Sequence, residues 1–253
     1  MSILEVRQLS KVYGDKQAFQ EVLKEINLDV DEGEFISIMG PSGSGKTTLL
    51  NVLSSIDYMT KGSITINGKQ LEKLSNKQLS DIRKKDIGFI FQDYNILNTL
   101  TVKENIMLPL SVQKLDKKEM NERYQRITQA LNIFEISDKY PSDISGGQRQ
   151  RTSAARAFIT YPKIIFADEP TGALDSKNTR DLLQRFQKIN ELYNATIVMV
   201  THDPLAASFS ERVIMLKDGQ IFTEIYQGED DKNVFHKEIL RAQSILGGMM
   251  YEF

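Results

Sequence analysis

The stretch that decides the fold is Gly40-Pro-Ser-Gly-Ser-Gly-Lys-Thr47, a turn that fits the pattern G-x-x-x-x-G-K-[ST]. An apolar strand, Phe35–Met39, is expected to lead into it, and a helix from Gly45 to about Ile56 to lead out. Glycines let backbone N–H groups converge on one anion, and the start of the helix adds the positive end of its dipole. The sequence therefore predicts a loop that binds phosphate groups.

The side chains of this turn indicate a nucleoside triphosphate. Lys46 is placed to reach the β- and γ-phosphates, and Thr47 to supply a hydroxyl to Mg²⁺. A chance match in a glycine-containing turn is the alternative, and the flanking strand and helix argue against it. We expect ATP and Mg²⁺ as ligands. The predicted ATP-binding residues here are Gly40, Pro41, Ser42, Gly43, Ser44, Gly45, Lys46, Thr47 and Thr48.

Two carboxylates end a second apolar strand, Ile164-Ile-Phe-Ala-Asp-Glu169. In a P-loop protein, an acid at the end of a neighbouring strand holds Mg²⁺ through water, and Asp168 is predicted to do so. Glu169 points the other way, toward the end of the γ-phosphate, where it can orient or deprotonate the attacking water. The alternative is an ordinary acidic strand end in solvent. Together with the phosphate loop, the pair predicts ATP hydrolysis.

A second glycine-rich turn, Ser145-Gly-Gly-Gln-Arg149, opens a helix with Ser145 as its N-cap. It offers backbone amides to an anion, yet the nucleotide of the same chain already has its phosphates in the first turn. We therefore expect this turn to face the γ-phosphate of a second copy, in a head-to-tail dimer that encloses two nucleotides. The alternative is a helix cap with two permissive glycines. The residues predicted to act across the dimer are Ser145, Gly146, Gly147 and Gln148.

Composition excludes several other kinds of site. The 253 residues include no cysteine, which rules out disulfides, thiolate metal sites and cysteine nucleophiles, and the two histidines do not suffice for a multi-histidine metal site. With 32 basic and 34 acidic residues, the net charge of −2 lacks the basic excess of a duplex-binding domain, so no nucleic-acid partner is expected. We find neither a signal peptide nor a bilayer-spanning apolar run, so another chain would have to cross a membrane.

The pattern of apolar residues predicts alternating strands and helices, interrupted by a helical lobe. In that lobe, from Asp93 to about Ser142, apolar residues recur at helical spacing. Further helices are expected from Ser176 to about Glu191 and from Asp231 to about Leu246. The last helix is amphipathic and is either a dimer element or a cap packed on the core. The expected strands are Ile3–Leu9, Val22–Val30, Phe35–Met39, Ile64–Ile66, Ile87–Phe91, Ile164–Ala167, Thr196–Val200, Val213–Leu216 and Ile221–Ile225.

Four motifs stand in the order found in the ATPase subunits of ABC transporters: Gly40–Thr47, Ile144-Ser-Gly-Gly-Gln148, Ile165–Asp175 and Val200-Thr-His-Asp203. Residues 1–225 therefore resemble that family, although Ile144 replaces the usual leucine. The resemblance implies an α/β P-loop NTPase with a RecA-like core and an N-terminal antiparallel β subdomain. It also implies a helical subdomain inserted at about 93–158, and leaves 226–253 as a C-terminal helical extension.

The resemblance implies further site residues. Tyr13 is similar to the aromatic residue that stacks on adenine, and Gln92 to the glutamine that senses Mg²⁺ and the γ-phosphate. Asp175 is similar to the aspartate that links the two sites across the dimer, and His202 to the switch histidine that contacts the γ-phosphate. The implied catalytic residues are Glu169, His202 and Gln92, and the implied Mg²⁺ site is Thr47, Gln92 and Asp168.

Other stretches narrow the resemblance. Leu49–Asp57 and Gly88–Leu97 resemble the ATPases of lipoprotein-release, macrolide-export and cell-division systems. Thr101–Ile106, Gln150–Arg156 and the ending Leu246-Gly-Gly248 most resemble the bacitracin-resistance (Bce-type) ATPases. That group implies an ATPase at the cytoplasmic face of the membrane that serves resistance to antimicrobial peptides, beside a separate permease. Through the permease, it also implies a sensor histidine kinase as an indirect partner.

The helical lobe near Asp93–Leu100 is expected to form part of a groove for a cytoplasmic helix of the permease. Three alternatives remain open at this point. The first is the ATPase of one of the other transport systems named above. The second is a soluble ABC ATPase of translation or DNA repair, and the third is a P-loop kinase for a small molecule. Only the first two use the second glycine-rich turn and Asp175.

Overall fold

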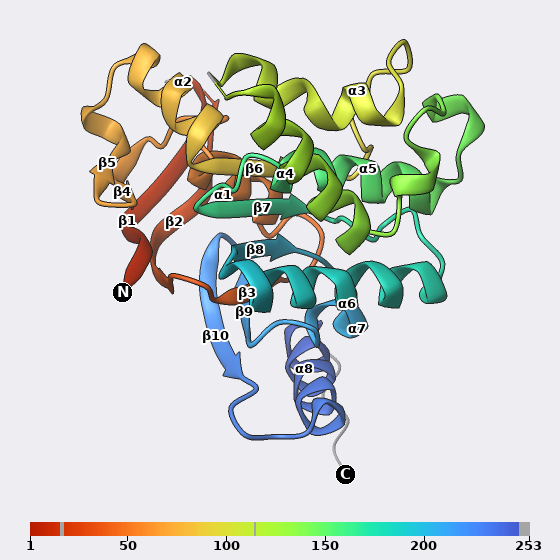
Figure 1. Ribbon diagram of the computed structural model, residues 1–253. Coiled ribbons are helices and arrows are strands. Elements are labelled where there is room, and N and C mark those ends of the chain that lie inside the picture. Colours follow the sequence, from red (N-terminus) through yellow and green to blue (C-terminus); the bar gives the residue numbers. More distant parts are fainter. Residues whose placement is uncertain (16–17, 114, 248–253) are drawn as a thin grey trace.

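The computed structural model describes residues 1–15, 18–113 and 115–247, and Figure 1 shows the arrangement of its elements. An antiparallel sheet in the order β2-β1-β4-β5 forms the N-terminal part, as predicted. Its first two strands are longer than predicted, because they pair with each other as far as Asp15 and Ala18. The predicted turn at 13–15 thus lies within a strand. The bounds are β1 (Ser2–Asp15), β2 (Ala18–Asp31), β4 (Lys61–Ile66) and β5 (Lys69–Gln70).

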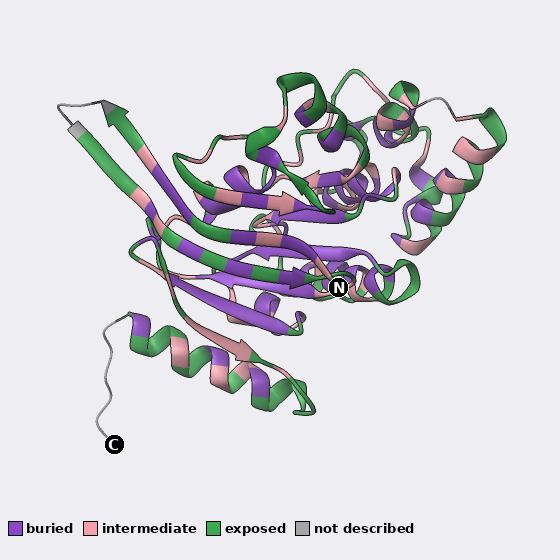
Figure 2. Ribbon diagram, turned by 90° about the vertical axis from the view of Figure 1, so that its left-hand side faces the viewer, coloured by how far each residue is buried: buried purple, intermediate pink, exposed green. Residues whose placement is uncertain are grey.

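A six-stranded sheet in the order β10-β9-β3-β8-β7-β6 forms the centre. All its pairings are parallel except the hairpin of β9 and β10. Continuous apolar runs suit parallel strands that are buried on both faces, and Figure 2 shows these strands buried. Loops that follow β3, β7 and β8 therefore leave the sheet at one edge. The bounds are β3 (Phe35–Met39), β6 (Ile87–Ile90), β7 (Ile164–Asp168), β8 (Thr196–Val200), β9 (Arg212–Lys217) and β10 (Gln220–Tyr226).

Helices cover the central sheet and build the lobe. One of them, α2, was not predicted, although Ser75 and Gln78 form a capping box at its start. The lobe's first helix is shorter than the apolar spacing suggests, because Pro109 lacks an N–H and the chain continues as the 3₁₀ turn Leu108–Val112. The bounds are α1 (Lys46–Leu53), α2 (Asn76–Lys85), α3 (Val102–Met107), α4 (Lys117–Ala130), α5 (Gly146–Phe158), α6 (Ser176–Tyr193), α7 (Pro204–Ala207) and α8 (Lys232–Leu246).

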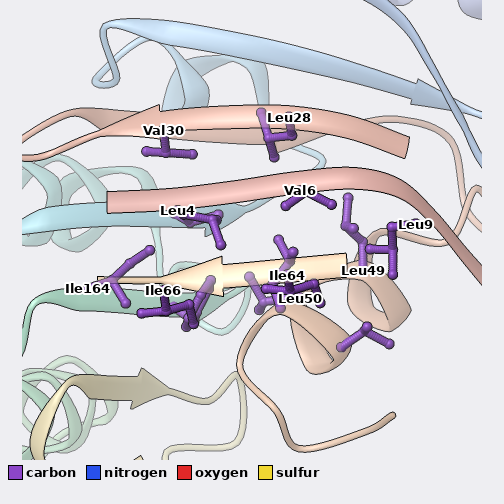
Figure 3. Close-up of a cluster of buried hydrophobic side chains, with 14 of the residues drawn as sticks. Leu4, Val6, Leu9, Leu28, Val30, Leu49, Leu50, Ile64, Ile66 and Ile164 are labelled. Carbon is purple, nitrogen blue, oxygen red and sulfur yellow. The ribbon is translucent and has the colours of Figure 1, made fainter. Parts of the chain in front are cut away.

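Apolar clusters fix the relative positions of these parts. One cluster packs the antiparallel sheet onto α1 and the central sheet, with Ile64 beside Leu50 in Figure 3. A second cluster joins α3, α4, α5 and α6 to the other face of the central sheet. The phosphate loop between β3 and α1 is thus supported by packing on both sides.

The C-terminal helix α8, at the bottom of Figure 1, packs against the core. Its buried residues Phe235, Ile239 and Leu246 form a third cluster with Met39 of β3 and Ala207 of α7, among others. The apolar face of the predicted amphipathic helix is therefore covered as a cap would be. Residues 248–253 of the predicted extension, with Gly248 of the ending quoted above, lie outside the described residues. Within the described ranges, no helix is long and apolar enough to cross a membrane.

Candidate functional site

The loop between β3 and α1 depends on two of its glycines. A Cβ atom on Gly40 would stand 2.1 Å from the carbonyl oxygen of Leu216, so the strand end and β9 approach too closely for a side chain. Gly45 has φ +99° and lies against Val22 and Leu23 of the antiparallel sheet. Glycine alone adopts both arrangements without strain. The backbone of the predicted phosphate loop is therefore pressed between the two sheets.

Lys46 lies inside this loop and is buried, with 8% of its surface exposed. Its Nζ donates hydrogen bonds of 2.9 Å to the carbonyls of Gly40 and Pro41. Burial lowers the pKa of Lys46, while the nearby carboxylates of Glu169 and Asp168 oppose that shift. Ser44 Oγ is also buried and has no hydrogen-bond partner among the described residues. A buried cation and an unpaired hydroxyl on one loop fit a bound phosphate group.

Asp168 ends β7 beside the first turn of α1. The hydroxyl of Thr47 donates to its Oδ1 at 3.4 Å. Burial raises the pKa of Asp168, and the bond from Thr47 and the charge of Lys46 act against it. A carboxylate and a hydroxyl are oxygen ligands of the kind that Mg²⁺ prefers. The pair thus fits the predicted Mg²⁺ position, although the cation's remaining ligands would come from phosphate and water.

The three predicted catalytic residues converge around Gly172. Glu169 Oε1 lies 3.0 Å from His202 Nδ1, which joins the end of β7 to the end of β8. A Cβ atom on Gly172 would stand 3.3 Å from Gln92 Nε2 and 3.5 Å from Glu169 Oε2. Glu169 itself has φ +43°, a left-handed conformation held by its N–H bond to the Val200 carbonyl at 2.9 Å. The sequence analysis placed Gln92 and Glu169 at the ends of strands and did not predict that both lie beside Gly172.

Tyr13 lies beside α1 but is engaged by other residues of this chain. Its hydroxyl donates to Asp57 Oδ2 at 2.6 Å, and Lys11 Nζ lies 4.6 Å from the centre of its ring. The bond to Asp57 raises the pKa of Tyr13, and a hydrogen bond with the Thr48 side chain opposes that shift. Lys11, on the same strand as Tyr13, and Asp57, in the segment after α1, were not predicted to orient the tyrosine.

The second glycine-rich turn starts α5 with a capping box. The Gln148 N–H donates to Ser145 Oγ at 3.3 Å, and the Ser145 N–H donates to Gln148 Oε1 at 2.9 Å. A Cβ atom on Gly146 would stand 3.3 Å from the Tyr94 hydroxyl, and one on Gly147 would stand 3.1 Å from Asn178 Oδ1. These neighbours lie in the lobe and in α6, rather than in the phosphate loop.

Asp175 caps the start of α6. Its carboxylate accepts two hydrogen bonds of 2.8 Å from Asn178, one from the backbone N–H and one from Nδ2. These bonds lower the pKa of Asp175. The structure therefore brings Asp175 next to the second glycine-rich turn through Asn178. Sequence reasoning missed Asn178, although its place three residues after a capping aspartate is a recognisable signal.

The acidic strand β7 is not next to β3 as predicted, because β8 lies between them, but both strands end at the same edge of the parallel sheet. A phosphate loop with an acidic strand end at that edge defines the P-loop nucleoside triphosphatases. Comparison with known proteins narrows this class. Residues 23–172 match the family model described as "ABC transporter". The chain belongs to the ABC transporter family, and it is an ATP-binding and ATP-hydrolysing cassette of that family.

Two curated relatives and one solved structure illustrate the similarity. The bacitracin export ATP-binding protein BceA of Halalkalibacterium halodurans is 58% identical over 98% of both chains. The macrolide export ATP-binding/permease protein MacB of Aggregatibacter actinomycetemcomitans is 42% identical over 96% of this chain and 38% of its own. The cassette MJ0796 of Methanocaldococcus jannaschii, solved as a post-hydrolysis dimer with ADP and Pi, has a TM-score of 0.80 and 39% identity, covering 88% of this chain and 98% of its own.

These findings confirm the predicted family and the predicted ABC ATPase fold. The roles of single residues are a different matter. The structure brings together the loop residues, Asp168, Glu169, His202 and Gln92, and it places the second glycine-rich turn beside Asp175. What each side chain does in catalysis stays a prediction.

Proposed function

We propose that this chain hydrolyses ATP to power a membrane transporter that protects cells from bacitracin-like antimicrobial peptides. The observation that carries the proposal is the 58% identity to a bacitracin export ATP-binding protein over 98% of both chains. Near-complete coverage argues for the same partner surfaces as well as the same nucleotide site. The chain would then work at the cytoplasmic face of the membrane, bound to a separate permease.

In the proposed reaction, Glu169 orients a water molecule toward the γ-phosphate and accepts a proton from it. His202 Nδ1, 3.0 Å from Glu169 Oε1, holds the carboxylate in place, while the His202 side chain itself stays largely exposed. Lys46 would exchange its two carbonyl partners for phosphate oxygens. Tyr13 would contact the adenine.

Mg²⁺, when bound, neutralises charge on the β- and γ-phosphates. Thr47, Asp168 and Gln92 are the residues that would hold it. Gln92 Nε2 already lies near Gly172, which also adjoins Glu169. A shift of the segment that carries Gln92 would therefore displace the carboxylate of Glu169, which orients the water.

The second glycine-rich turn supports a head-to-tail dimer. Ser145 and Gln148 cap each other, which fixes the turn at the start of α5. Its two glycines lie beside Tyr94 of the lobe and Asn178 of α6. It would therefore complete the site of a second copy, and MJ0796, a relative of 39% identity, forms a dimer in its solved structures.

A groove between the central sheet and the lobe suits a helix of the permease. Its cavity measures about 440 Å³ and has apolar walls from Phe89, Phe91, Pro109 and Val112, with Arg83 at its rim. The predicted segment 93–100 contributes Asn95. An apolar floor with a basic edge fits an amphipathic helix that carries acidic residues. A sensor histidine kinase would be reached indirectly, through the permease.

Growth in bacitracin tests the proposed function. In a strain that lacks its own bacitracin transporter, the chain with its permease should restore growth, and the Glu169→Gln variant should not. Loss of a general base lowers turnover by about 10²- to 10⁴-fold. Glu122→Gln, the same substitution at an exposed position of α4, serves as the matched control. Restored growth with macrolide in place of bacitracin would favour the macrolide-export alternative.

Copurification in mild detergent tests the groove. Val112→Asp should release the permease, because a charge in an apolar contact is costly to desolvate. Leu192→Asp on α6 is the control, since both residues have 62% of their surface exposed. Loss of the permease in both variants, or in neither, would contradict the groove. Recovery of ribosomes or DNA in place of a permease would favour the soluble alternative.

A further inference from the structure

Asn178 stands between two groups to which the proposed function gives separate tasks. Asp175 is the N-cap residue of α6, and Gly147 lies in the first turn of α5. The Nδ2 group of Asn178 donates to Asp175 Oδ2 at 2.8 Å. The other end of the same amide, Oδ1, lies 3.1 Å from where a Cβ atom of Gly147 would stand. One planar side chain therefore donates to the carboxylate of Asp175 and lies close beside Gly147 of the second glycine-rich turn.

We propose that Asn178 is a positioning residue that locks Asp175 to the turn Ser145–Gln148, so that both reach the neighbouring subunit as one unit. The inference rests on the proposed dimer. A turn that moves relative to Asp175 would present two interface groups in the wrong register. Interface groups must be held within fractions of an ångström of their binding geometry. A link between Asp175 and the turn would hold both in that geometry against the neighbouring subunit.

The surrounding contacts make the link rigid. One turn further along the two helices, Arg151 of α5 pairs with Asp181 of α6 at 3.2 Å. Arg185 holds the same carboxylate at 2.8 and 3.0 Å and also donates to the carbonyl of Ala130 in α4. This ion pair network fixes α5 against α6 behind the site. Asn178 extends the same connection to the first residues of both helices.

A simple capping role makes a different prediction. The backbone N–H of residue 178 donates to Asp175 Oδ1 at 2.8 Å, and any residue other than proline can supply that bond. If capping were the whole role, the side chain at 178 would affect at most the unfolding midpoint. The positioning role instead predicts a loss of ATP-driven dimer affinity.

The first experiment measures dimer dissociation constants with ATP by sedimentation, in the Glu169→Gln background that retains ATP. Asn178→Asp keeps the size of the side chain but sets a carboxylate against that of Asp175. We expect the dissociation constant to rise at least tenfold, with ATP affinity of the dilute monomer unchanged. Arg180→Ala, an exposed residue of the same helix, should stay within twofold. An unaltered dimer with Asn178→Asp would overturn the proposal.

Ser145→Arg separates this proposal from the dimer itself. If Ser145→Arg weakens the dimer and Asn178→Asp does not, only the role of Asn178 is wrong. If neither weakens it, the proposed dimer fails.

A double-mutant cycle keeps the proposal testable if Asn178→Asp unfolds. Gly147→Ala should press its methyl group against the Asn178 amide, and Asn178→Ala should relieve that contact. We therefore expect the double variant to dimerise better than the sum of the single effects predicts. Strictly additive effects on the dissociation constant would overturn the contact between the two residues.

Discussion

At the scale of single residues, Lys46 brings a buried positive charge to the loop that is to hold phosphates. Lys46→Ala removes that charge together with both of its bonds to the loop carbonyls. Loss of one such electrostatic stabiliser typically lowers turnover by about 10²- to 10³-fold. Phosphate release and ATP titration measure the effect, with Lys118→Ala on the exposed face of α4 as the control. Unchanged affinity and turnover would contradict the role of Lys46.

Asp168 gives a prediction on pH. Burial raises the pKa of Asp168 above its value in the unfolded chain. At a pH between these two pKa values, the folded protein therefore binds a proton that the unfolded chain has lost. Stability without nucleotide therefore falls as pH rises through that window and stays lower above it. Asp168→Asn should remove this contribution and raise the unfolding midpoint at neutral pH, while ATP hydrolysis is lost. Thermal unfolding of both proteins across pH measures it; parallel curves would contradict this account.

Site residues could be predicted from the sequence where the backbone geometry is local, and could not be predicted where it depends on distant contacts. The residues of the phosphate loop, with Asp168 and Glu169, follow from short motifs whose backbone geometry is fixed by neighbours in sequence. The approach of Asn178 to Gly147 depends on how α5 meets α6. No local pattern of the sequence encodes that meeting.

At the scale of elements, the parallel strands were predictable because continuous burial leaves an unbroken apolar run. The ends of the helices were harder to predict. Pro109 turned the end of an apparent helix into a 3₁₀ turn, and α2 escaped notice because its mean hydropathy is low and only two of its residues, Leu79 and Ile82, are buried. The strands β1 and β2 extend beyond the apolar residues that predicted them, because pairing along a hairpin continues into polar sequence.

The helix α8, the last described element of the chain, packs close to the predicted nucleotide site. Phe235 is fully buried in the cluster that contains Met39, the residue before Gly40. Phe235→Ala should therefore lower the free energy of unfolding by about 3–5 kcal/mol. Val234→Ala, an adjacent and half-exposed position, should cost much less. Urea unfolding measures both, and equal losses would show that α8 adds little to the core.

At the scale of the whole molecule, the groups predicted to act in hydrolysis lie on two different surfaces. The phosphate loop, Asp168 and Glu169 lie where the parallel strands end, whereas the second glycine-rich turn lies at the start of α5 with its neighbours in the lobe and α6. The order of the motifs predicted this division. The amphipathic pattern of α8 left a dimer element and a cap on the core as alternatives, because the choice between them depends on the complementary shapes of finished elements.

This division makes the rate depend on protein concentration. If each site needs the turn of a second copy, ATP turnover per chain should rise with concentration and level off once dimers prevail. Glu169→Gln should shift the equilibrium toward an ATP-bound dimer, because the ligand binds across the interface and is no longer consumed. Sedimentation with and without ATP measures the dimer, and phosphate release at serial dilutions measures the rate. Full turnover per chain at dilutions where sedimentation finds monomers would mean that one copy completes its own site.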